Sequence, residues 1–374
     1  MRVLLTGGGS AGHINPALAI AETVKQNDSN ATIAFVGIRN GKEEDLVPRE
    51  GYPLHYVESM GIRRSLSPKN IKALWLALTS PYSPKTNRIL DEFCPDIVIG
   101  TGGYACWPIM AAAARRGIPT AVHESNALPG LAVRQLQGRV DRIWINFAKT
   151  AELLRKKEKT VQVGNPLRNG FGGLSKAEAR KRLGISEDRF FILSFGGSLG
   201  AEEVNRSIVE MMQGFSARHP EILHVHATGK RDFAETNAGF QNAGLKECEN
   251  CILLDYIYDM PLRMAAADLV ISRAGAMTLS ELALMQKTSI LIPSPNVADN
   301  HQYLNAKTLA DAGAAICLQE SEFADGALTR IAEHLFSDAN ARASMEQAIR
   351  GFADPDANCR IWDEICALTA AGKK

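Results

Sequence analysis

The sequence predicts an α/β fold built from two Rossmann-like domains that face a cleft. Strand-like and helix-like segments alternate along all 374 residues, which is typical of parallel sheets with helices on both faces. Two glycine-rich turns, Gly7–His13 and Gly196–Ala201, each follow an apolar strand and open a helix. A chain of this length exceeds one ordinary hydrophobic core, so the two turns indicate one domain each.

In the first half, apolar runs predict six strands, alternating with five helices. The strands are Arg2–Thr6, Thr32–Val36, Ile97–Gly100, Thr120–His123, Arg142–Asn146 and Thr160–Val163. The helices are Pro16–Lys25, Glu43–Glu50, Asn70–Leu78, Pro108–Arg115 and Leu131–Gln137. Gly164-Asn165-Pro166 ends the sixth strand and is the expected hinge, because glycine and proline break regular structure.

The second half repeats this alternation. Its expected strands are Phe191–Phe195, Leu223–Ala227, Ile252–Leu254, Leu269–Ser272, Ser289–Ile292 and Ala315–Leu318. Its expected helices are Glu203–His219, Pro261–Ala266, Thr278–Gln286, Gln302–Ala312 and Gly326–Leu335. Beyond these, Met345–Phe352 and Cys359–Leu368 are helical, and Asp354-Pro355-Asp356 separates them. We therefore expect domains at 1–163 and 164–345, with 346–374 as C-terminal helices that pack back on the N-terminal domain.

The composition excludes several classes of protein. Hydrophobic residues make up 45% and charged residues 22%, as in soluble globular proteins, and the net charge of +1 predicts no nucleic-acid partner. No apolar run approaches the roughly 18 residues of a membrane-spanning helix. Met1 and Arg2 lead directly into a strand, which leaves no room for a signal peptide. Seven scattered cysteines indicate reduced thiols in a cytosolic protein, and the Cys248/Cys251 pair lacks the further ligands of a zinc site.

The first glycine turn satisfies the dinucleotide-binding pattern G-x-G-x-x-G through Gly7, Gly9 and Gly12. An NAD-binding domain expects an acidic residue at the end of the second strand, where this chain has none. Arg39 at that position would suit the 2′-phosphate of NADP, which keeps this alternative open. A second complete glycine turn, however, is not required by a dehydrogenase with one cofactor.

A third strand–turn–helix, Leu269–Glu281, favours a nucleotide sugar instead. Its helix start offers N–H groups to a diphosphate, together with the hydroxyls of Ser272, Thr278 and Ser280. Glu281, about one helical turn further in, suits two sugar hydroxyls. The alternative is that Thr278 and Glu281 form a capping box.

Seven stretches in order along the chain resemble the MurG family of bacterial glycosyltransferases, which add N-acetylglucosamine to lipid I in peptidoglycan synthesis. They are Gly7–His13, Gly100–Tyr104, His123–Asn126, Gly164–Arg168, Gly196–Ala201, Arg273–Glu281 and Asn300–Gln302. The resemblance covers nearly the whole chain and implies the two-domain GT-B architecture. Ser10-Ala11 stands where many members have Thr-Gly, and Ser125 where many have Gln, which puts details of acceptor contact in doubt.

The resemblance implies that the donor, UDP-N-acetylglucosamine, binds mainly to the C-terminal domain and the lipid-linked acceptor to the N-terminal domain. Glu281 would bind the ribose hydroxyls, and Ile257 would present its backbone to uracil. The implied donor contacts are Ser10, Ala11, Gly12, Asn126, Arg168, Ser198, Ile257, Ala276, Met277, Thr278, Leu279, Ser280, Glu281 and Gln302. The implied acceptor-side residues are Gly102, Gly103, Tyr104 and His123.

The family's reaction inverts the anomeric centre and forms a β-1,4 bond to the C4 hydroxyl of the N-acetylmuramoyl-pentapeptide of undecaprenyl-pyrophosphate-linked lipid I. Such a displacement needs a base on the hydroxyl and stabilisation of the departing diphosphate. His13 is the candidate base, since histidine titrates near neutral pH, and Glu124 and His123 are its rivals. The helix at Ala276 supplies fixed dipoles, so we expect no obligatory metal or cofactor. Asp354-Pro355-Asp356 matches a metal-binding D-x-D pattern, but two aspartates that flank a proline between helices are more often a helix break.

A basic, amphipathic segment indicates how the protein meets a lipid-linked acceptor. Between Ser59 and Leu90 there are six basic residues and no acidic one. The side chains expected to face the membrane are Ile71, Lys72, Leu74, Trp75 and Leu78. An apolar stripe edged by cations suits an anionic bilayer, although the same stripe could bury against the first sheet. We therefore expect a peripheral protein on the cytoplasmic side of the cell membrane, with other cell-wall synthesis proteins as partners.

Two other interpretations stay open at this level. One is a GT-B transferase or sugar-nucleotide epimerase that acts on a soluble or different lipid acceptor. The other is a non-catalytic subunit that only binds a sugar nucleotide. The joint presence of His13, Asn126 and Glu281 speaks against loss of catalysis.

Overall fold

The chain forms two compact α/β units. The computed structural model describes residues 1–61, 68–197, 200–297 and 300–372. One unit comprises Met1–Asn169 together with Asp356–Lys374, and the other comprises Gly170–Pro355. The chain thus leaves the first unit just beyond the Gly164-Asn165-Pro166 stretch and returns to it at the Asp354-Pro355-Asp356 break.

The first unit is built on a seven-stranded, all-parallel sheet in the order β3-β2-β1-β4-β5-β6-β7. The strands are β1 Arg2–Thr6, β2 Thr32–Gly37, β3 Leu54–Tyr56, β4 Ile97–Gly100, β5 Thr120–Glu124, β6 Arg142–Ile145 and β7 Thr160–Gln162. The central strands are almost continuously apolar, because helices cover both faces of a parallel sheet.

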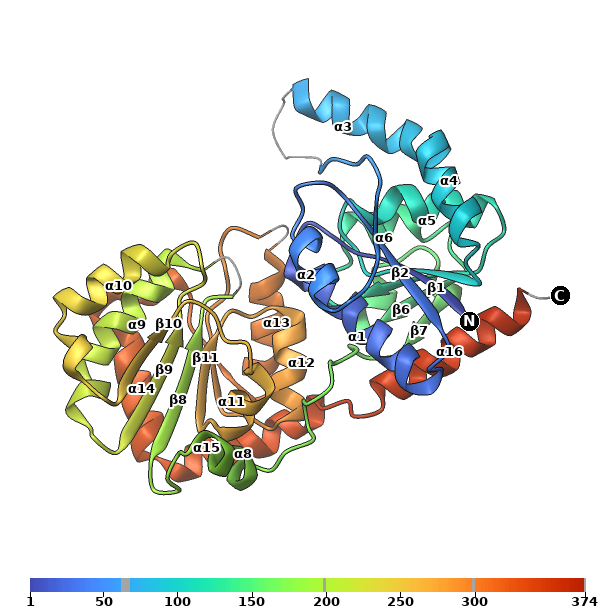
Figure 1. The fold of residues 1–374 in the computed structure, drawn as a ribbon. Coiled ribbons are helices and arrows are strands. Elements are labelled where there is room, and N and C mark those ends of the chain that lie inside the picture. The colour runs from blue at the N-terminus through green and yellow to red at the C-terminus, as the bar shows by residue number, and fades with distance from the viewer. Residues whose placement is uncertain (62–67, 198–199, 298–299, 373–374) are drawn as a thin grey trace. The chain divides into compact units, whose positions relative to one another are not determined.

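Helices enclose this sheet from both sides (Figure 1). They are α1 Ala11–Asn27, α2 Glu43–Arg49, α3 Pro68–Thr79, α4 Pro84–Phe93, α5 Cys106–Arg115, α6 Leu131–Leu136, α7 Lys149–Glu152 and α16 Ala357–Ala371. Ile14 of α1 and Ile365 of α16 share one core cluster, whereas α4, α5 and α6 pack in the cluster on the other face. Trp144 Nε1 of β6 donates to Glu364 Oε2 of α16 at 3.2 Å. Helix α16 thus belongs to the first unit, as expected of the C-terminal helix, whereas residues 346–355, which were expected to return with it, belong to the second unit.

The second unit repeats the topology with a six-stranded parallel sheet in the order β10-β9-β8-β11-β12-β13. Its strands are β8 Phe190–Phe195, β9 Ile222–Ala227, β10 Cys251–Leu254, β11 Leu269–Ser272, β12 Ser289–Leu291 and β13 Ile316–Cys317. In both units the sheet runs outward in both directions from a first strand, β1 or β8, which is the doubly wound arrangement that the sequence predicts.

In the described part of the second unit, eight α-helices surround the sheet. They are α8 Lys176–Leu183, α9 Glu202–Gly214, α10 Phe233–Asn242, α11 Met260–Ala266, α12 Ala276–Leu284, α13 His301–Ala310, α14 Ala327–Ser337 and α15 Ala339–Ile349. Ile208 of α9 and Leu335 of α14 belong to the core cluster on one face. Met264 of α11 and Leu282 of α12 belong to the cluster on the other.

Several elements differ from the expected ones. The edge strand β3 was not expected, because it has only three residues, all half-buried, and so lacks an apolar pattern. Helix α4 was also missed, although Ser83 caps it by accepting from Thr86 N at 3.1 Å and Pro84 follows at the first position. Helices α8 and α10 fall in polar stretches with little periodicity. The expected helix Glu203–His219 ends earlier, at Gly214.

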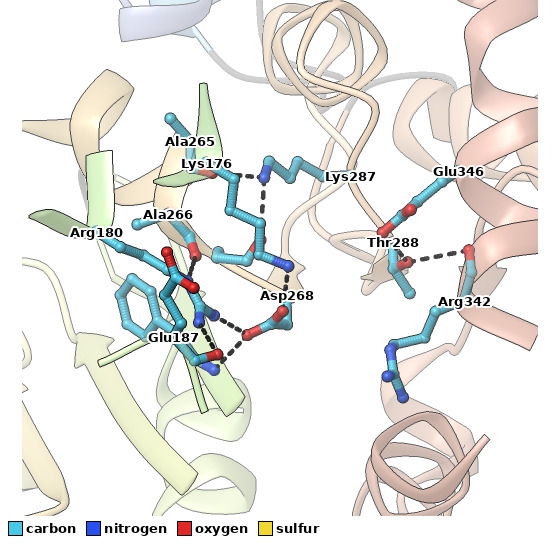
Figure 2. A network of polar contacts seen from close by, with 12 residues as sticks. Lys176, Arg180, Glu187, Ala265, Ala266, Asp268, Lys287, Thr288, Arg342 and Glu346 are labelled. Atoms are coloured by element: carbon cyan, nitrogen blue, oxygen red, sulfur yellow. Dashed lines mark hydrogen bonds and ion pairs between the residues drawn. The ribbon is translucent and has the colours of Figure 1, made fainter. Parts of the chain in front are cut away.

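A charged network closes the amino end of the second sheet, the end opposite the helix-opening loops (Figure 2). Asp268, directly before β11, pairs with Lys176 and with the buried Arg180, and accepts from Phe191 N at 2.6 Å. Lys287 is 7% exposed and donates to the carbonyl oxygens of Ala265 and Ala267 at 2.6 and 3.0 Å. The network joins α8, α11 and two strands, and therefore fixes this edge of the unit.

Candidate active site

In each unit, the loops that carry the expected site residues lie where the strand order reverses. The first glycine turn follows β1, and Gly100–Tyr104 follows its neighbour β4. In the second unit, Gly196–Ala201 follows β8 and the Arg273–Gly275 turn follows its neighbour β11. In doubly wound sheets, ligands bind at this switch point beyond the carboxyl ends of the strands.

His13 lies in the first turn of α1 and faces the loop after β4. Its Nδ1 is 3.1 Å from the carbonyl oxygen of Thr101. A carbonyl only accepts, so the neutral ring carries its proton on Nδ1, and Nε2 is the basic nitrogen. Thr101 Oγ1 donates in turn to His13 O at 2.6 Å. The first bond orients the imidazole and the second holds the His13 backbone, so the ring has a fixed place, as a general base requires.

Gly102 and Gly103 make room for this ring. A Cβ on Gly102 would lie 2.8 Å from His13 Nδ1, and one on Gly103 would lie 2.2 Å from Gly8 O. Both glycines also have positive φ, 98° and 78°, which other residues rarely adopt. The structure therefore gives both positions a steric role beside His13, while Tyr104 next to them is 37% exposed.

Glu124, the rival base, is occupied by the loop that follows β5. One carboxylate oxygen accepts from Asn126 N and Nδ2, both at 3.0 Å, and the other from Gly130 N at 2.7 Å. The side chain is buried, and burial raises its pKa, against the effect of these hydrogen bonds. A carboxylate already bound by three N–H donors orders the loop and places Asn126.

His123, the other rival and an expected acceptor-side residue, is completely buried. Its Nε2 lies 2.8 Å from Gly164 O, and Ser125 Oγ lies 3.3 Å from its Nδ1. Burial lowers the pKa of His123 to about 4, so the ring is neutral at physiological pH. Through its bond to Gly164, His123 joins β5 to the segment that follows β7. Its side chain has no exposed surface for a ligand.

In the second unit, Glu281 is half-buried in the second turn of α12. Helix α12 begins at Ala276 with Gly275 as its N-cap, so its first-turn N–H groups point beyond the carboxyl ends of the strands. Thr278 is therefore inside the helix, and the capping-box alternative is wrong. Within the described residues, the Glu281 carboxylate has no hydrogen-bond or ion-pair partner. Burial raises its pKa to about 7.

Ile257 and Gln302 bring further polar groups to this end of the second unit. The side chain of Ile257 is 5% exposed in the core, while its N–H and C=O make no hydrogen bond to the described part of the chain. Gln302 Oε1 accepts from Ser294 N at 2.9 Å, which ties α13 to the loop after β12. A pair of unused backbone groups on a buried residue suits the edge of a nucleobase.

Two expected donor residues need separate mention. Arg168 lies in the first unit, where its Nε and Nη2 donate to Glu22 and Glu50, each at 2.7 Å. These ion pairs use Nε and Nη2, so a donor contact by Arg168 could be made by its remaining N–H groups. Ser198 lies outside the described residues.

Two residues with a role at these loops were missed from sequence. Arg273 donates to Ile292 O and Pro293 O at 3.3 and 3.2 Å and pairs with Glu320, so it ties the turn before α12 to the loop after β12. Glu43, the first residue of α2, lies beneath the first glycine turn and accepts from Gly9 N. Neither residue carries a local signal, because their partners are distant in the sequence.

The remaining sequence features do not form sites of their own. Arg39, considered for the 2′-phosphate of NADP, stacks 4.7 Å from the ring centroid of Tyr56. Cys248 and Cys251 are free thiols. Among the described residues, no group of three or more His, Cys, Asp or Glu side chains could hold a metal ion.

Helix α3 exposes part of its apolar stripe. Trp75 and Leu78 are 61% and 64% exposed, and Tyr82 just beyond the helix is 63% exposed. Ala73 and Leu76 are buried, so the helix is anchored on its other side. The side chains of Ile71, Lys72 and Leu74 lie outside the described part of the structure. No helix in the described ranges is long and apolar enough to cross a membrane.

The fold and these loops define a class: glycosyltransferases with two doubly wound domains. Residues 3–145 match the N-terminal domain of glycosyltransferase family 28, and residues 191–361 match its C-terminal domain. The chain belongs to glycosyltransferase family 28.

Relatives of full length support the same family. The chain is 37% identical to the UDP-N-acetylglucosamine--N-acetylmuramyl-(pentapeptide) pyrophosphoryl-undecaprenol N-acetylglucosamine transferase of Desulforudis audaxviator, with 100% of both chains covered. It is 38% identical to the transferase of the same name from Acetivibrio thermocellus, with 98% and 97% covered.

Solved structures show the same architecture. The crystal structure of Acinetobacter baumannii MurG matches 98% of this chain and 99% of its own, with a TM-score of 0.72 and 27% identity. S. aureus MnaA, solved with UDP, matches 98% of this chain and 96% of its own, with a TM-score of 0.67 and 13% identity. At that identity, the second likeness shows the fold alone. The GT-B expectation and the resemblance to the MurG family are confirmed.

Proposed function

We propose that this protein transfers N-acetylglucosamine from UDP-N-acetylglucosamine to lipid I and forms lipid II in peptidoglycan synthesis. The names of its full-length relatives support the substrates. The observation that carries the donor site is Glu281, a half-buried carboxylate in the second turn of α12 that has no hydrogen-bond or ion-pair partner among the described residues. Two ribose hydroxyls would supply the donors that this carboxylate lacks.

The donor is assigned to the second unit. The first-turn N–H groups of α12 and the side chains of Thr278 and Ser280 would hold the diphosphate, and the backbone of Ile257 would pair with uracil. As UDP departs, the helix dipole stabilises the charge that develops on the diphosphate, without proton transfer.

The acceptor is assigned to the first unit. His13 Nε2 would take the proton of the C4 hydroxyl as that oxygen attacks the anomeric carbon from the face opposite UDP, which inverts the centre. Glu124 would act as a positioning residue for Asn126, because all of its hydrogen bonds go to the loop 124–130.

Helix α3 is the proposed membrane contact. The exposed Trp75, Leu78 and Tyr82 line or border a hollow of about 320 Å³ and would enter the interfacial region of an anionic bilayer. The lipid-linked acceptor would then reach the protein without leaving the cytoplasmic face of the membrane.

The direct experiment measures UDP release with purified protein, UDP-N-acetylglucosamine and a lipid I analogue. Release that requires both substrates, with formation of the disaccharide product, is the expected result. The variant Glu281→Gln should bind UDP at least tenfold more weakly, because a neutral amide is a poorer acceptor for two hydroxyls. Glu320→Gln is the control, because Glu320 lies near the same loops but is paired with Arg273. It tests whether the loss of any nearby carboxylate weakens UDP binding. No UDP release with this acceptor would refute the proposed reaction, and unchanged UDP affinity of Glu281→Gln would refute the ribose contact.

A further inference from the structure

A buried carboxylate lies beneath the first glycine turn. Glu43, the first residue of α2, is 1% exposed. Its Oε2 accepts from Gly9 N at 3.2 Å and its Oε1 from Ile38 N at 3.0 Å. No lysine, arginine or histidine of the described chain pairs with it. Burial of a carboxylate costs several kcal/mol unless hydrogen bonds compensate for it, and here the N–H groups of Gly9 and Ile38 provide them.

Three glycines form the walls of the space that Glu43 occupies. A Cβ on Gly8 would lie 2.4 Å from Glu43 Oε1, one on Gly37 would lie 2.4 Å from Cγ, and one on Gly41 would lie 2.5 Å from Cδ. Gly8 comes from the first turn, Gly37 from the end of β2 and Gly41 from the segment after it, about thirty residues further along the chain. The space is shaped for a side chain of this length, and the carboxylate group is at its end.

The bond to Gly9 determines what the glycine turn can offer a ligand. Gly9 has a φ of 84°, and its N–H points to Glu43, so this N–H is not available to a phosphate. The next residue, Ser10, accepts from the backbone N–H groups of His13 and Ile14 at 3.1 and 3.2 Å. The carboxylate therefore fixes the backbone immediately before the helical turn that carries His13.

Tyr104 is fixed against the same residue. A Cβ on Gly9 would lie 2.8 Å from Tyr104 Cε1, so the ring packs directly on this glycine. Burial first, and the charge of Glu43 second, raise the pKa of the Tyr104 phenol. The buried Glu43 carboxylate thus holds the backbone of Gly9, which contacts Tyr104 and precedes the helical turn of His13.

We propose that Glu43 is a positioning residue for glycosyl transfer, which holds Gly9 so that His13 and Tyr104 are correctly placed at the acceptor. This inference rests on the proposed function and deepens it. Glu43 touches neither the reacting sugar nor the diphosphate in this assignment; it acts through the Gly9 backbone.

Two substitutions separate this role from packing. Glu43→Gln keeps the shape but turns an NH₂ group toward one of the two backbone N–H donors. Glu43→Met keeps a similar volume and removes both bonds, and such replacements of buried charges are often tolerated by the fold. Glu44→Gln is the matched control, because the neighbouring Glu44 carboxylate also accepts a backbone N–H, from Asn40 at 2.9 Å, but does not reach the glycine turn.

Measurements of kcat, of UDP affinity by calorimetry and of Tm should be made on wild type and all three variants. We expect both Glu43 variants to lose at least tenfold in kcat while UDP affinity stays within twofold of wild type, and Glu44→Gln to match wild type in all three. Wild-type kcat in folded Glu43→Gln and Glu43→Met would overturn the inference, as would a parallel loss of UDP affinity. An inactive wild type would instead contradict the proposed function.

Gly37→Ala covers the case in which neither Glu43 variant folds. The three heavy atoms nearest to its Cβ would all belong to Glu43, so the substitution displaces that side chain while Glu43 itself is kept. The same selective loss of kcat is expected. Unchanged kcat in Gly37→Ala would overturn the positioning role. So would failure of Glu43→Gln, Glu43→Met and Gly37→Ala to fold.

Discussion

Glu124 ends strand β5, and Glu281 lies in helix α12, which follows strand β11. Both carboxylates are desolvated, but their surroundings differ. Glu124 accepts three hydrogen bonds from its own loop, whereas Glu281 accepts none from the described residues. A bound carboxylate orders structure, and an unbound one is available to a ligand. This contrast supports the proposal that Glu124 orders its loop, that Glu281 binds the donor and that His13 is the base.

The substitution His13→Gln tests the assignment of the base. Glutamine can still donate to Thr101 O but cannot accept a proton, so we expect kcat to fall by about 10²–10⁴-fold. UDP affinity should be nearly unchanged, because the donor is assigned to the second unit. His55→Gln, in the edge strand β3 of the same unit, is the control and should behave as wild type. A His13→Gln variant that retains half of the wild-type kcat would rule His13 out as the base.

At the scale of single residues, sequence reasoning identified side chains that belong to a local motif. His13 ends a glycine turn and Glu281 follows a strand–turn–helix, so their types and spacing were informative. Glu43 was not found, because the glycines that surround it and the N–H groups that bind it come together only when β1, β2 and α2 pack. His123 matched the family pattern but is fully buried, which a sequence cannot show.

Among the elements, helix α3 has an apolar stripe whose burial or exposure could not be decided from the sequence. The periodicity of the stripe predicted both a buried and an exposed interpretation. In the structure Trp75 and Leu78 of this stripe are exposed, while Ala73 and Leu76, which lie outside the stripe, pack inward. Which side of an amphipathic helix meets the core depends on the rest of the unit, and so the sequence left both interpretations open.

The double variant Trp75→Ser with Leu78→Ser tests the proposed membrane contact. Co-sedimentation with vesicles that contain anionic lipid should fall at least tenfold, because the exposed apolar area is removed while the buried side of α3 is kept. Leu131→Ser with Leu153→Ser removes two exposed leucines elsewhere in the same unit and should have little effect. Added salt should weaken wild-type binding. Binding that survives in the Trp75/Leu78 variant would show that α3 is not the contact.

For the molecule as a whole, the network at the amino end of the second sheet predicts a pH dependence of stability. Burial, with a smaller contribution from the charge of Lys176, lowers the pKa of Lys287 from 10.5 to about 8. The unfolded chain therefore binds more protons than the folded one between these values, and this residue makes the free energy of unfolding rise with pH from about 8 to 10.5. The full change is about 3 kcal/mol, from 1.36 kcal/mol per pKa unit.

Denaturant unfolding across this pH range checks the prediction. In Lys287→Met the rise attributable to Lys287 should be absent, because nothing titrates at that position. Lys176→Met, which removes a half-exposed partner of Asp268, should retain most of it. Identical pH slopes for wild type and Lys287→Met would contradict the lowered pKa.

The sequence by itself determined the alternation of strands and helices, the two doubly wound units and the glycine turns at their strand ends, because periodicity and turn chemistry are local properties. It also located Glu281 and His13, which depend on short spacings. Only the tertiary structure decided which carboxylate is occupied, that Glu43 lies beneath the first turn, and which face of α3 is exposed. These depend on contacts between residues tens of positions apart, whose energies come from burial and from hydrogen bonds that form only when the sheets are assembled.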